Sequence, residues 1–474
     1  MRDLPGASPG LAARLDRLPL TRLHLRAAMA LAFAYFFEFS DLNTFALAAP
    51  SLVRQWGLSV NAVAAITSAS FGGMFVGAAA GGWIADRLGR KTTFVASVLV
   101  YTTASLLNAL AWDVGSAAVL RLVTGVGLSS MVVTANTYVS ELFPARSRGR
   151  WMAAIATFGL VGIPATAWIA RLLTPLAPWG WRLIFVWGGL GLAALVFTRG
   201  MPESPRWRSN RGQWREAEAI VASLEAEARR GDAALPEPEA RPDPPPQPRA
   251  PYMELFRQGQ ARRTLFLLAL WAVQTVGFYG FVSWVPTLLA KHGFSVVHSL
   301  TFTSVMAICN PLGALLSYAV VDHVERKWFI AIGALAIAAI GIAYGFSAQP
   351  VFIMLFGALM VMGLQTSAVA LYTYTPELFP TGIRSSGMGL CYGAGRLMNV
   401  VSPFIIGAIF QGSGYVSVFL FIAVCWLLVA TLTALFGPPT ARRSLEALGD
   451  SGQGDLGQAE QVANLHAAPA EPPA

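Results

Sequence analysis

The stretch YVSELFPARSR, residues 138–148, returns as YTPELFPTGIR at residues 374–384, an offset of 236 residues. Other paired motifs share this offset: DRLGRK at Asp86 with DHVERK at Asp322, Pro50 with Pro286, and GLSV at residue 57 with GFSV at residue 293. One ungapped register therefore relates the segment 31–150 to the segment 267–386. Because several anchors coincide in this register, the sequence predicts a duplicated structural unit.

Long apolar runs separate the motifs of the repeat. The chain has 474 residues, of which 55% are hydrophobic and only 12% charged, whereas a soluble domain carries roughly 25% charged residues. Twelve runs are long enough to cross a hydrocarbon core about 30 Å thick. They lie near residues 27–48, 62–84, 92–112, 116–140, 151–173, 181–198, 264–289, 299–321, 328–347, 351–375, 386–410 and 415–437. A lipid-embedded run must be helical, because each backbone polar group then finds a partner inside its own segment. The sequence predicts an all-α membrane protein with twelve transmembrane helices.

The basic residues occupy alternate loops rather than one patch. The formal net charge is +9, and Lys and Arg gather before the first apolar run and after each even-numbered run. Loops rich in Lys and Arg stay in the cytoplasm, so both termini are expected there. The expected location is a plasma membrane, which is the inner membrane in a bacterium. The basic charge is thus explained by membrane topology, and no nucleic-acid partner is expected.

A polar interruption divides the apolar runs into six and six. It contains EAEAIVASLEAEARR, which can form a surface helix, followed by a Pro-rich charged spacer. The first apolar run is too long for a signal peptide and is interpreted as a retained helix. Five parts are predicted: a cytoplasmic N-terminal segment at 1–26, a six-helix bundle at 27–198, a partly disordered linker at 199–263, a second six-helix bundle at 264–437 and a disordered tail at 438–474.

Two motifs carry a family resemblance. GGWIADRLGRKTT, residues 81–93, resembles the signature loop between the second and third helices of the major facilitator superfamily. PESPRW, residues 202–207, resembles a motif shared by sugar porters, organic-ion transporters and nicotinate-permease-like metabolite symporters. The resemblance implies a monomeric secondary transporter made of two six-helix bundles, related by a pseudo-two-fold axis along the membrane normal and enclosing a central cavity.

The resemblance also implies a latch that joins the two halves on the cytoplasmic side in the outward-open state. Its residues are expected to be Gly82, Asp86, Arg87, Gly89, Arg90, Lys91, Glu141, Arg148, Glu203, Arg206, Asp322, Glu377 and Arg384. Asp86 lies at the C-terminal end of its own helix, where the helix dipole disfavours an anion. A partner is therefore expected on another helix or on a nearby Arg. In the second copy, Glu325 replaces Gly89.

Two carboxylates, Glu38 and Asp41, lie in the middle of the first apolar run. An acid at a helix centre costs about 2.5–3.5 kcal/mol, which the neighbouring apolar side chains do not clearly offset. The i,i+3 spacing places both acids on one face, so this face is expected to point into the protein or into a water-filled cavity. Counting along the helices puts Asp41 and Arg121 at similar depth in the outer half, which predicts an ion pair between them.

The role of these charges follows from the resemblance. An acid on the first helix and an Arg on the fourth serve proton coupling in sugar porters, and the arrangement here is similar. The acid-x-x-acid spacing looks more like the first helix of aromatic-acid and nicotinate-type symporters, which have Asp in the first place where this chain has Glu38. Asp41, Glu38 and Arg121 are thus the candidate proton-coupling residues. The alternative is a purely structural pair of Asp41 with Arg121.

The second half supplies the candidates for substrate binding. Arg396 lies about ten residues into the eleventh run, near the midplane, and can bind a carboxylate through two hydrogen bonds. Its alternative role is helix packing with an acid. Gln274 stands where the repeat places Glu38, in a run rich in aromatic residues. The candidates are Arg396, Gln274, Tyr279, Trp284, Asn310, Gln365 and Asn399.

The function expected from these patterns is proton-coupled symport of a small organic anion, an aromatic or heteroaromatic carboxylate. The alternatives are a sugar-porter-like symporter, a drug or metabolite efflux antiporter, and a non-transporting sensor with a transporter fold. The sequence contains no HExxH, Walker-A, CxxC or GxSxG motif. No enzymatic activity, cofactor or metal site is therefore predicted.

Overall fold

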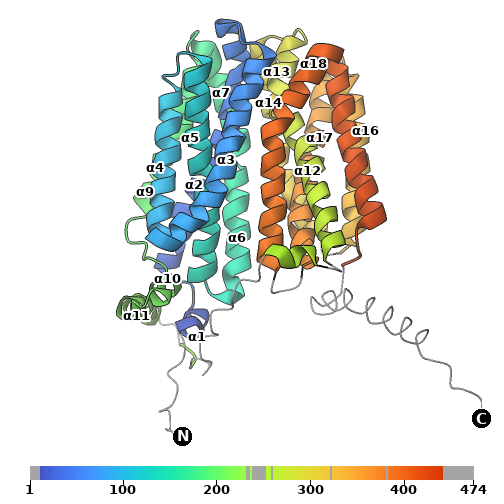
Figure 1. Cartoon of the computed structure of the whole chain (residues 1–474). Coiled ribbons are helices and arrows are strands. Elements are labelled where there is room, and N and C mark those ends of the chain that lie inside the picture. Colours follow the sequence, from blue (N-terminus) through green and yellow to red (C-terminus); the bar gives the residue numbers. More distant parts are fainter. Residues whose placement is uncertain are drawn as a thin grey trace, which may run out of the picture.

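The fold is known from a computed structural model, which describes residues 11–230, 235–237, 252–257, 260–320, 323–379 and 383–440. Every regular element in these ranges is a helix. Two groups of long helices stand side by side, and the short helices α1 (Leu11–Asp16), α10 (Pro205–Asn210) and α11 (Trp214–Arg230) lie beneath one of them (Figure 1). We call this end of the molecule the α11 end. Apart from residues 235–237, the Pro-rich spacer lies outside the described ranges, as does the tail beyond residue 440.

The first group is built from the N-terminal half of the chain. Its helices are α2 (Arg22–Trp56), α3 (Val60–Leu88), α4 (Arg90–Asn108), α5 (Val114–Leu142), α6 (Ala145–Leu160), α7 (Gly162–Leu173), η1 (Thr174–Leu176), α8 (Trp181–Gly189), η2 (Leu190–Ala193) and α9 (Ala194–Phe197). Helices α3 and α5 approach closely, because a side chain at Gly73 or Gly77 would collide with the α5 backbone at Leu122 or Val126. Small residues at such contacts are typical of membrane helices.

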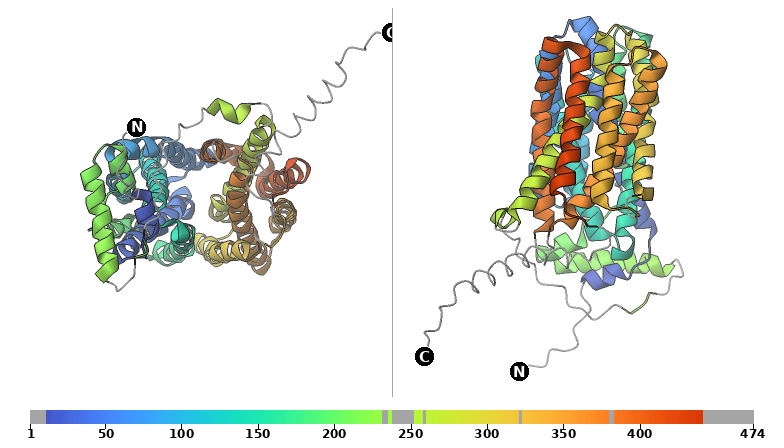
Figure 2. Two further views of the ribbon diagram at one scale, coloured as in Figure 1. Left: turned by 90° about the horizontal axis from the view of Figure 1, so that it is seen from below. Right: turned by 90° about the vertical axis from the view of Figure 1, so that its right-hand side faces the viewer.

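The second group is built from the C-terminal half. Its helices are η3 (Tyr252–Phe256), α12 (Ala261–Val282), α13 (Val285–Lys291), α14 (Val296–Ala307), α15 (Cys309–Val320), α16 (Arg326–Gly345), α17 (Pro350–Glu377) and α18 (Arg384–Phe436). Helix α18 is two helices joined at Gly414, whose φ of 83° and ψ of −171° are not helical. Seen from the α11 end, the two groups lie next to each other (Figure 2).

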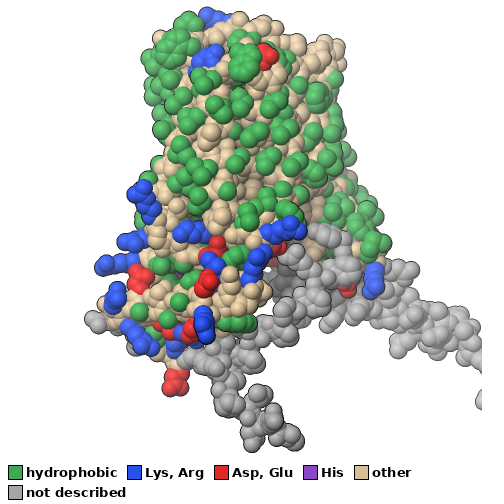
Figure 3. Space-filling view, turned by 60° about the vertical axis from the view of Figure 1, so that its left-hand side comes forward, with side chains coloured by type: hydrophobic (Ala, Val, Ile, Leu, Met, Phe, Trp, Pro, Cys, Tyr) green, Lys and Arg blue, Asp and Glu red, His purple; other side chains and the backbone are tan. Residues whose placement is uncertain are grey.

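The positions of the helices agree with the twelve membrane-spanning runs predicted from the sequence. Among the described residues, eight helical segments are long and apolar enough to span one, and the last of them, Ser386–Phe436, contains the break at Gly414. Helices α2 and α4 and the shorter apolar segment Trp181–Phe197 coincide with the remaining predicted runs. The structure is thus consistent with twelve spans. On the face shown in Figure 3, charged side chains gather towards the α11 end, and the wall above them is largely hydrophobic.

The duplication seen in the sequence reappears as matched local structure. Gly57 and Gly293 both have positive φ, at 62° and 108°, and each precedes a new helix. Two residues later, Ser59 and Ser295 accept a hydrogen bond from the backbone N–H of Ala62 and His298, both at 3.2 Å. Such a side chain satisfies a backbone donor that the first turn leaves unpaired. The repeated GLSV and GFSV motifs are therefore helix starts.

The other repeated motif fixes the α11 end of each half. Tyr138 donates to the carbonyl of Pro202 and Tyr374 to that of Pro438, both at 2.8 Å. The ion pairs Arg90–Glu141 and Arg326–Glu377 also match, at 3.0 Å and 2.9 Å. All these pairs are related by the 236-residue offset. The repeat thus conserves contacts as well as helices.

The two halves touch each other at the end opposite α11. Asn61 on α3 accepts a hydrogen bond from Gln411 on α18 at 2.9 Å. Arg171 on α7 donates to Thr301 on α14 at 2.6 Å, and Ser304 donates to the carbonyl of Ala167 at 2.8 Å. These residues lie near the start of α3, on α14, near the end of α7 and just before the break in α18 at Gly414. The opposite end is therefore closed by direct contact between the halves.

A small helical module covers the α11 end of the N-terminal half. Leu15 on α1 is buried, as is Leu224 on α11. Arg14 and Arg17 both bind the Glu225 carboxylate, at 2.8 and 2.7 Å, and Arg14 also pairs with the exposed Glu218. These hydrogen bonds, those from Arg14 first, lower the pKa of Glu225 to about 2.

Replacing Glu225 with Gln is expected to loosen α1 from α11. A hydrogen bond to a charged group contributes about 1.5 kcal/mol, so backbone hydrogen exchange in residues 11–18 should accelerate by roughly tenfold. Because the folded-state pKa is depressed, the contact should persist at neutral pH and be lost only as pH falls from about 4.5 towards 2. Glu218→Gln is the matched control, because Glu218 pairs with the same Arg14 from an exposed position. Equal exchange in both variants would contradict the role given to Glu225.

Candidate functional site

A cavity of about 470 Å³ lies between the two halves. Its walls come from α2, α5 and α6 of the first group and from α12, α17 and α18 of the second. Asn136 and Tyr372, which line it, lie two residues before the tyrosines that fix the α11 end of each half. The cavity therefore extends from the middle of the molecule towards the α11 end, away from the closed end.

Arg396, on α18, is the positive charge of this cavity. Its side chain is 9% exposed and lies against tyrosines. It donates to the hydroxyl of Tyr392 and, at 3.4 Å, to that of Tyr279, and its guanidinium carbon lies 4.8 Å from the Tyr392 ring centroid. No carboxylate of the described residues forms an ion pair with it. A buried guanidinium held only by neutral groups has unused capacity to bind an anion.

Aromatic rings form much of the wall around Arg396. Tyr279 packs edge-on against Phe71 with ring centroids 4.9 Å apart. Trp271 packs edge-on against Tyr372 at 5.0 Å and against Tyr392 at 6.0 Å. Edge-to-face contacts such as these hold the rings in fixed orientations. Such walls suit a planar ring better than a flexible polar chain.

Glu38, on α2, is the negative charge of the cavity. Its side chain is 3% exposed, and its Oε2 atom has no hydrogen-bond partner among the described residues. Tyr35, one turn earlier, donates to Asn136 at 2.8 Å. Gln274, the repeat equivalent of Glu38, also lines the cavity, so the two halves place a charged and a neutral residue at matching positions.

Asp41 and Arg121 form the predicted ion pair, with Arg121 Nη1 2.8 Å from Asp41 Oδ2. Both side chains are fully buried, at 0% and 1% exposure. Arg121 also donates to Ser70 at 3.0 Å and to Thr44 at 3.2 Å. The pair lies in the core of the first group and does not line the cavity. A buried pair is stable only when its remaining polar atoms are satisfied, as they are here.

Three residues support this ion pair but were not predicted from the sequence. Ser105 on α4 donates to the second oxygen of Asp41. Ser70 on α3 satisfies the Nε of Arg121. Gly188 on α8 leaves the room for Asp41, because a Cβ there would lie 2.5 Å from the carboxylate oxygen. Their roles depend on contacts between segments that are distant in the sequence, and no local motif indicates them.

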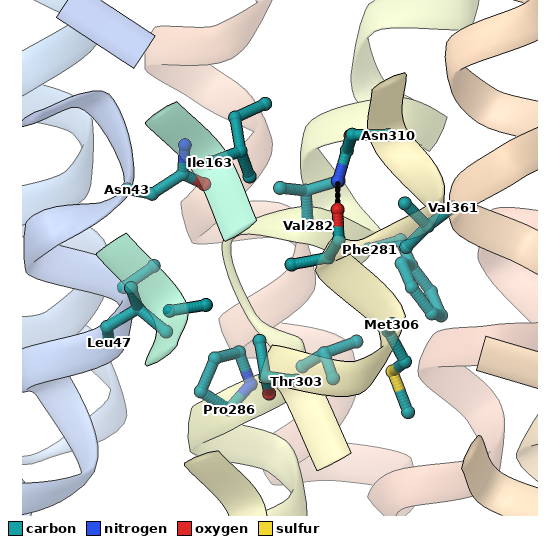
Figure 4. Close-up of a pocket in the computed structure, with 14 residues that line it drawn as sticks. Asn43, Leu47, Ile163, Phe281, Val282, Pro286, Thr303, Met306, Asn310 and Val361 are labelled. Carbon is teal, nitrogen blue, oxygen red and sulfur yellow. Dashed lines mark hydrogen bonds between the residues drawn. The ribbon is translucent and has the colours of Figure 1, made fainter. Parts of the chain in front are cut away.

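The other substrate candidates fall into three groups. Gln365 and Asn399 line the cavity, and neither amide atom of the fully buried Asn399 has a partner in the described structure. Asn310 instead lines a separate apolar pocket of about 40 Å³ near the closed end, where it donates to the Ala307 carbonyl at 3.0 Å (Figure 4). Trp284 is 2% exposed and lines neither space.

Five of the residues expected at the latch form one network on the N-terminal half: Asp86, Arg90, Lys91, Glu141 and Glu203. Arg90 pairs with Asp86 at 2.9 Å and with Glu141 at 3.0 Å. The Glu203 carboxylate accepts hydrogen bonds from the backbone N–H groups of Arg90 and Lys91, at 2.8 and 2.9 Å. It therefore stabilises the start of α4, where a helix favours an anion.

Glycine at position 89 makes this arrangement possible. Its φ is 101°, and a side chain there would collide with the Glu203 carboxylate. In the second half Glu325 occupies the equivalent position, and its carboxylate accepts from the backbone N–H of Thr440 at 2.8 Å. In both halves a carboxylate thus joins the start of the third helix to the segment that follows the sixth helix. In the first half the carboxylate belongs to the later segment (Glu203), and in the second half it belongs to the residue before the third helix (Glu325).

The remaining latch candidates lie elsewhere on the N-terminal half, on the C-terminal half or outside the described residues. Arg87 stacks over Trp83 at 3.8 Å, and Arg206 lies 3.9 Å from Asp16. Arg148 approaches the Phe143 carbonyl at 3.5 Å, and Gly82 lies on α3 one turn before Asp86. Glu377 pairs with Arg326. Asp322 and the side chain of Arg384 lie outside the described part of the chain.

Comparison with known proteins gives a consistent result. The family described as "Sugar (and other) transporter" matches residues 26–450. A putative metabolite transport protein, YyaJ, of Bacillus subtilis is 40% identical over 435 residues, which cover 92% of this chain and 96% of that protein. The niacin transporter NiaP of Acinetobacter baylyi is 31% identical over 447 residues, which cover 93% and 99%.

A similar fold occurs in the xylose transporter XylE of E. coli, solved in a partially occluded inward-open conformation. The TM-score is 0.71 at 18% identity, and the match covers 89% of this chain and 99% of XylE. At this identity the likeness concerns the fold. The matched family and the full-length relatives show that the chain belongs to the sugar (and other) transporter family of the major facilitator superfamily, and is a multi-pass membrane transporter rather than an enzyme.

Proposed function

We propose that the protein is a proton-coupled symporter of a small aromatic or heteroaromatic carboxylate. The observation that carries this proposal is Arg396, a buried guanidinium without a carboxylate partner among the described residues, set in an aromatic-walled cavity. A substrate carboxylate would complete its coordination through two parallel hydrogen bonds. The niacin transporter among the relatives supports this class, since niacin is a heteroaromatic carboxylic acid.

The α12 wall of the cavity favours this class over a sugar. A sugar presents many hydroxyl groups, and each one that loses water needs a hydrogen-bonding partner. On the cavity-lining part of α12 only Gln274 and Thr275 offer polar side chains beside the Tyr279 hydroxyl, and Thr275 already contacts Gln274 at 3.3 Å. A sugar-porter-like symporter and an efflux antiporter are the alternatives that the transport assay below distinguishes.

Asp41 and Arg121 are proposed to couple a proton to transport. Protonation of Asp41 would remove the negative partner of Arg121 and leave a buried cation, which is costly. The packing of the four helices that meet at the pair would then favour a different arrangement. Coupling of this kind needs a group whose charge decides between two packings of the same core. In this view Asp41 carries the proton and Arg121 senses its charge.

The orientation of the protein is also a proposal. The α11 end carries the clustered Arg and Lys residues, so we place it and both termini in the cytoplasm. The cavity then faces the cytoplasm, and contacts such as Asn61–Gln411 seal the outer end. The protein would act as a monomer in which the segments 27–198 and 264–437 rock against each other. The Asp86–Arg90–Glu141 network would latch these two halves together when the cavity faces outward.

Uptake by liposomes holding the purified full-length protein tests the class and the coupling together. An inwardly directed proton gradient is expected to stimulate accumulation of labelled nicotinate or benzoate but not of glucose, because only the carboxylates can complete the coordination of Arg396. Stimulation of glucose uptake alone would support the sugar-porter alternative. Uptake of no solute in response to the gradient would refute proton symport.

Replacing Asp41 with Asn should abolish gradient-driven accumulation, because the neutral amide cannot exchange a proton. Substrate counterflow in the absence of a gradient should persist, which would also show that the variant is folded. Asp113→Asn is the control, since Asp113 caps the exposed start of α5. Normal accumulation by Asp41→Asn would contradict the role assigned to Asp41.

Replacing Arg396 with Gln should weaken carboxylate binding by roughly thirtyfold or more, because loss of a buried charged partner costs at least about 2 kcal/mol. Arg171→Gln is the matched control, since Arg171 contacts Thr301 near the closed end and does not line the cavity. Binding is measured by displacement of labelled substrate from the purified protein. Equal losses in the two variants would count against Arg396 as the carboxylate site.

A further inference from the structure

Glu38 and Arg396 face the same cavity from opposite halves of the protein. Glu38 belongs to α2 of the first half, and Arg396 belongs to α18 of the second. They are the only charged residues among those that line the cavity in the described part of the chain. The cavity is therefore bipolar, with an acid on one wall and a base on the other.

Neither charge forms an ion pair with another charged side chain of the described residues. No ion pair joins the two residues, although each lies within electrostatic reach of the other. Glu38 is 3% exposed and its Oε2 has no hydrogen-bond partner in the described structure, while Arg396 binds only neutral groups. A buried charge that the protein leaves uncompensated requires compensation from a proton or from a ligand.

The side chains around Glu38 offer aromatic faces rather than hydrogen-bond donors to its carboxylate. These surroundings suit a cation. The Tyr35 hydroxyl is used by Asn136, so it does not serve the carboxylate. The rings of Tyr35 and Phe39, with centroids 6.5 Å apart, belong to the same helix face, and Tyr279 lies across the cavity. Aromatic faces attract positively charged nitrogen groups, and an adjacent carboxylate strengthens that attraction.

The presence of both charges limits the kind of ligand that can compensate Glu38 and Arg396 at the same time. A simple anion on Arg396 would leave the Glu38 carboxylate without a counter-charge unless Glu38 took up a proton. A simple cation beside Glu38 would leave Arg396 in the same position. A ligand with one negative and one positive group compensates both walls at once, so charge complementarity favours it over either single charge.

We infer that the cavity selects zwitterionic carboxylates, in which the carboxylate binds Arg396 and a cationic nitrogen binds beside Glu38. This inference rests on the proposed function, because it assumes that Arg396 is the carboxylate site. It narrows the substrate class to ring or short-chain acids that carry a quaternary or protonated nitrogen, such as an N-methylated pyridine carboxylate. Glu38 then acts as a specificity-determining residue.

The test uses three carboxylates and the purified full-length protein. N-methylnicotinate has a permanent positive charge, nicotinate has a ring nitrogen that is neutral at pH 7.5 or so, and benzoate has no nitrogen. The wild-type protein is expected to bind N-methylnicotinate at least tenfold more tightly than benzoate. Glu38→Gln should weaken N-methylnicotinate binding by at least tenfold and leave benzoate binding unchanged or tighter. Glu38→Asp, which keeps the charge, should retain the preference.

The outcomes separate this inference from the proposed function. A wild-type protein that binds benzoate as well as or better than N-methylnicotinate would overturn the inference and leave carboxylate binding intact. Equal weakening of both ligands by Glu38→Gln would also overturn it. If wild-type protein binds none of the three carboxylates, the proposed function fails and the inference fails with it.

Discussion

The buried ion pair between Asp41 and Arg121 is the interaction around which the N-terminal half is arranged. Four helices contribute to it: α2 supplies Asp41, α3 Ser70, α4 Ser105 and α5 Arg121. Two charges removed from water are tolerated only if every remaining polar atom is satisfied. The positions of these helices relative to one another are consequently fixed by the geometry of one pair, and Gly188 on α8 is small because the pair occupies the space.

The second half solves the same packing problem without charge. The repeat equivalents of Asp41 and Arg121 are Gly277 and Gly357. The space that a side chain at Gly277 would need is filled by Trp426, and that at Gly357 by Met306. The two copies of the unit thus keep the same helix arrangement, although one copy holds a buried ion pair and the other packs uncharged side chains against glycines. In the proposed function, proton-dependent packing belongs to the first half and Arg396, the carboxylate anchor, to the second.

The sequence was sufficient for features that depend on composition, repetition and charge. The apolar runs predicted the helices, the 236-residue offset predicted a duplicated unit, and the similar depth of the two charges predicted the Asp41–Arg121 pair. Features that depend on packing between distant segments were not predictable. Nothing near Trp284 in the sequence indicates that it lies in the core rather than in the cavity, and the supporting roles of Ser105 and Gly188 require the positions of three other helices.

The two acids of the first helix lie in different surroundings although they are one turn apart. Glu38 reaches the cavity, whereas Asp41 is sealed by Ser105, Arg121 and the close approach of Gly188. In the proposed function, a proton carried by Asp41 therefore cannot exchange with cavity water while these contacts hold. Exchange requires the surrounding helices to separate, and a substrate that binds between the halves changes the energy of that separation. Under this proposal, linkage between Asp41 and a substrate on Arg396 needs no direct contact between them, because both would act on the same relative position of the two halves.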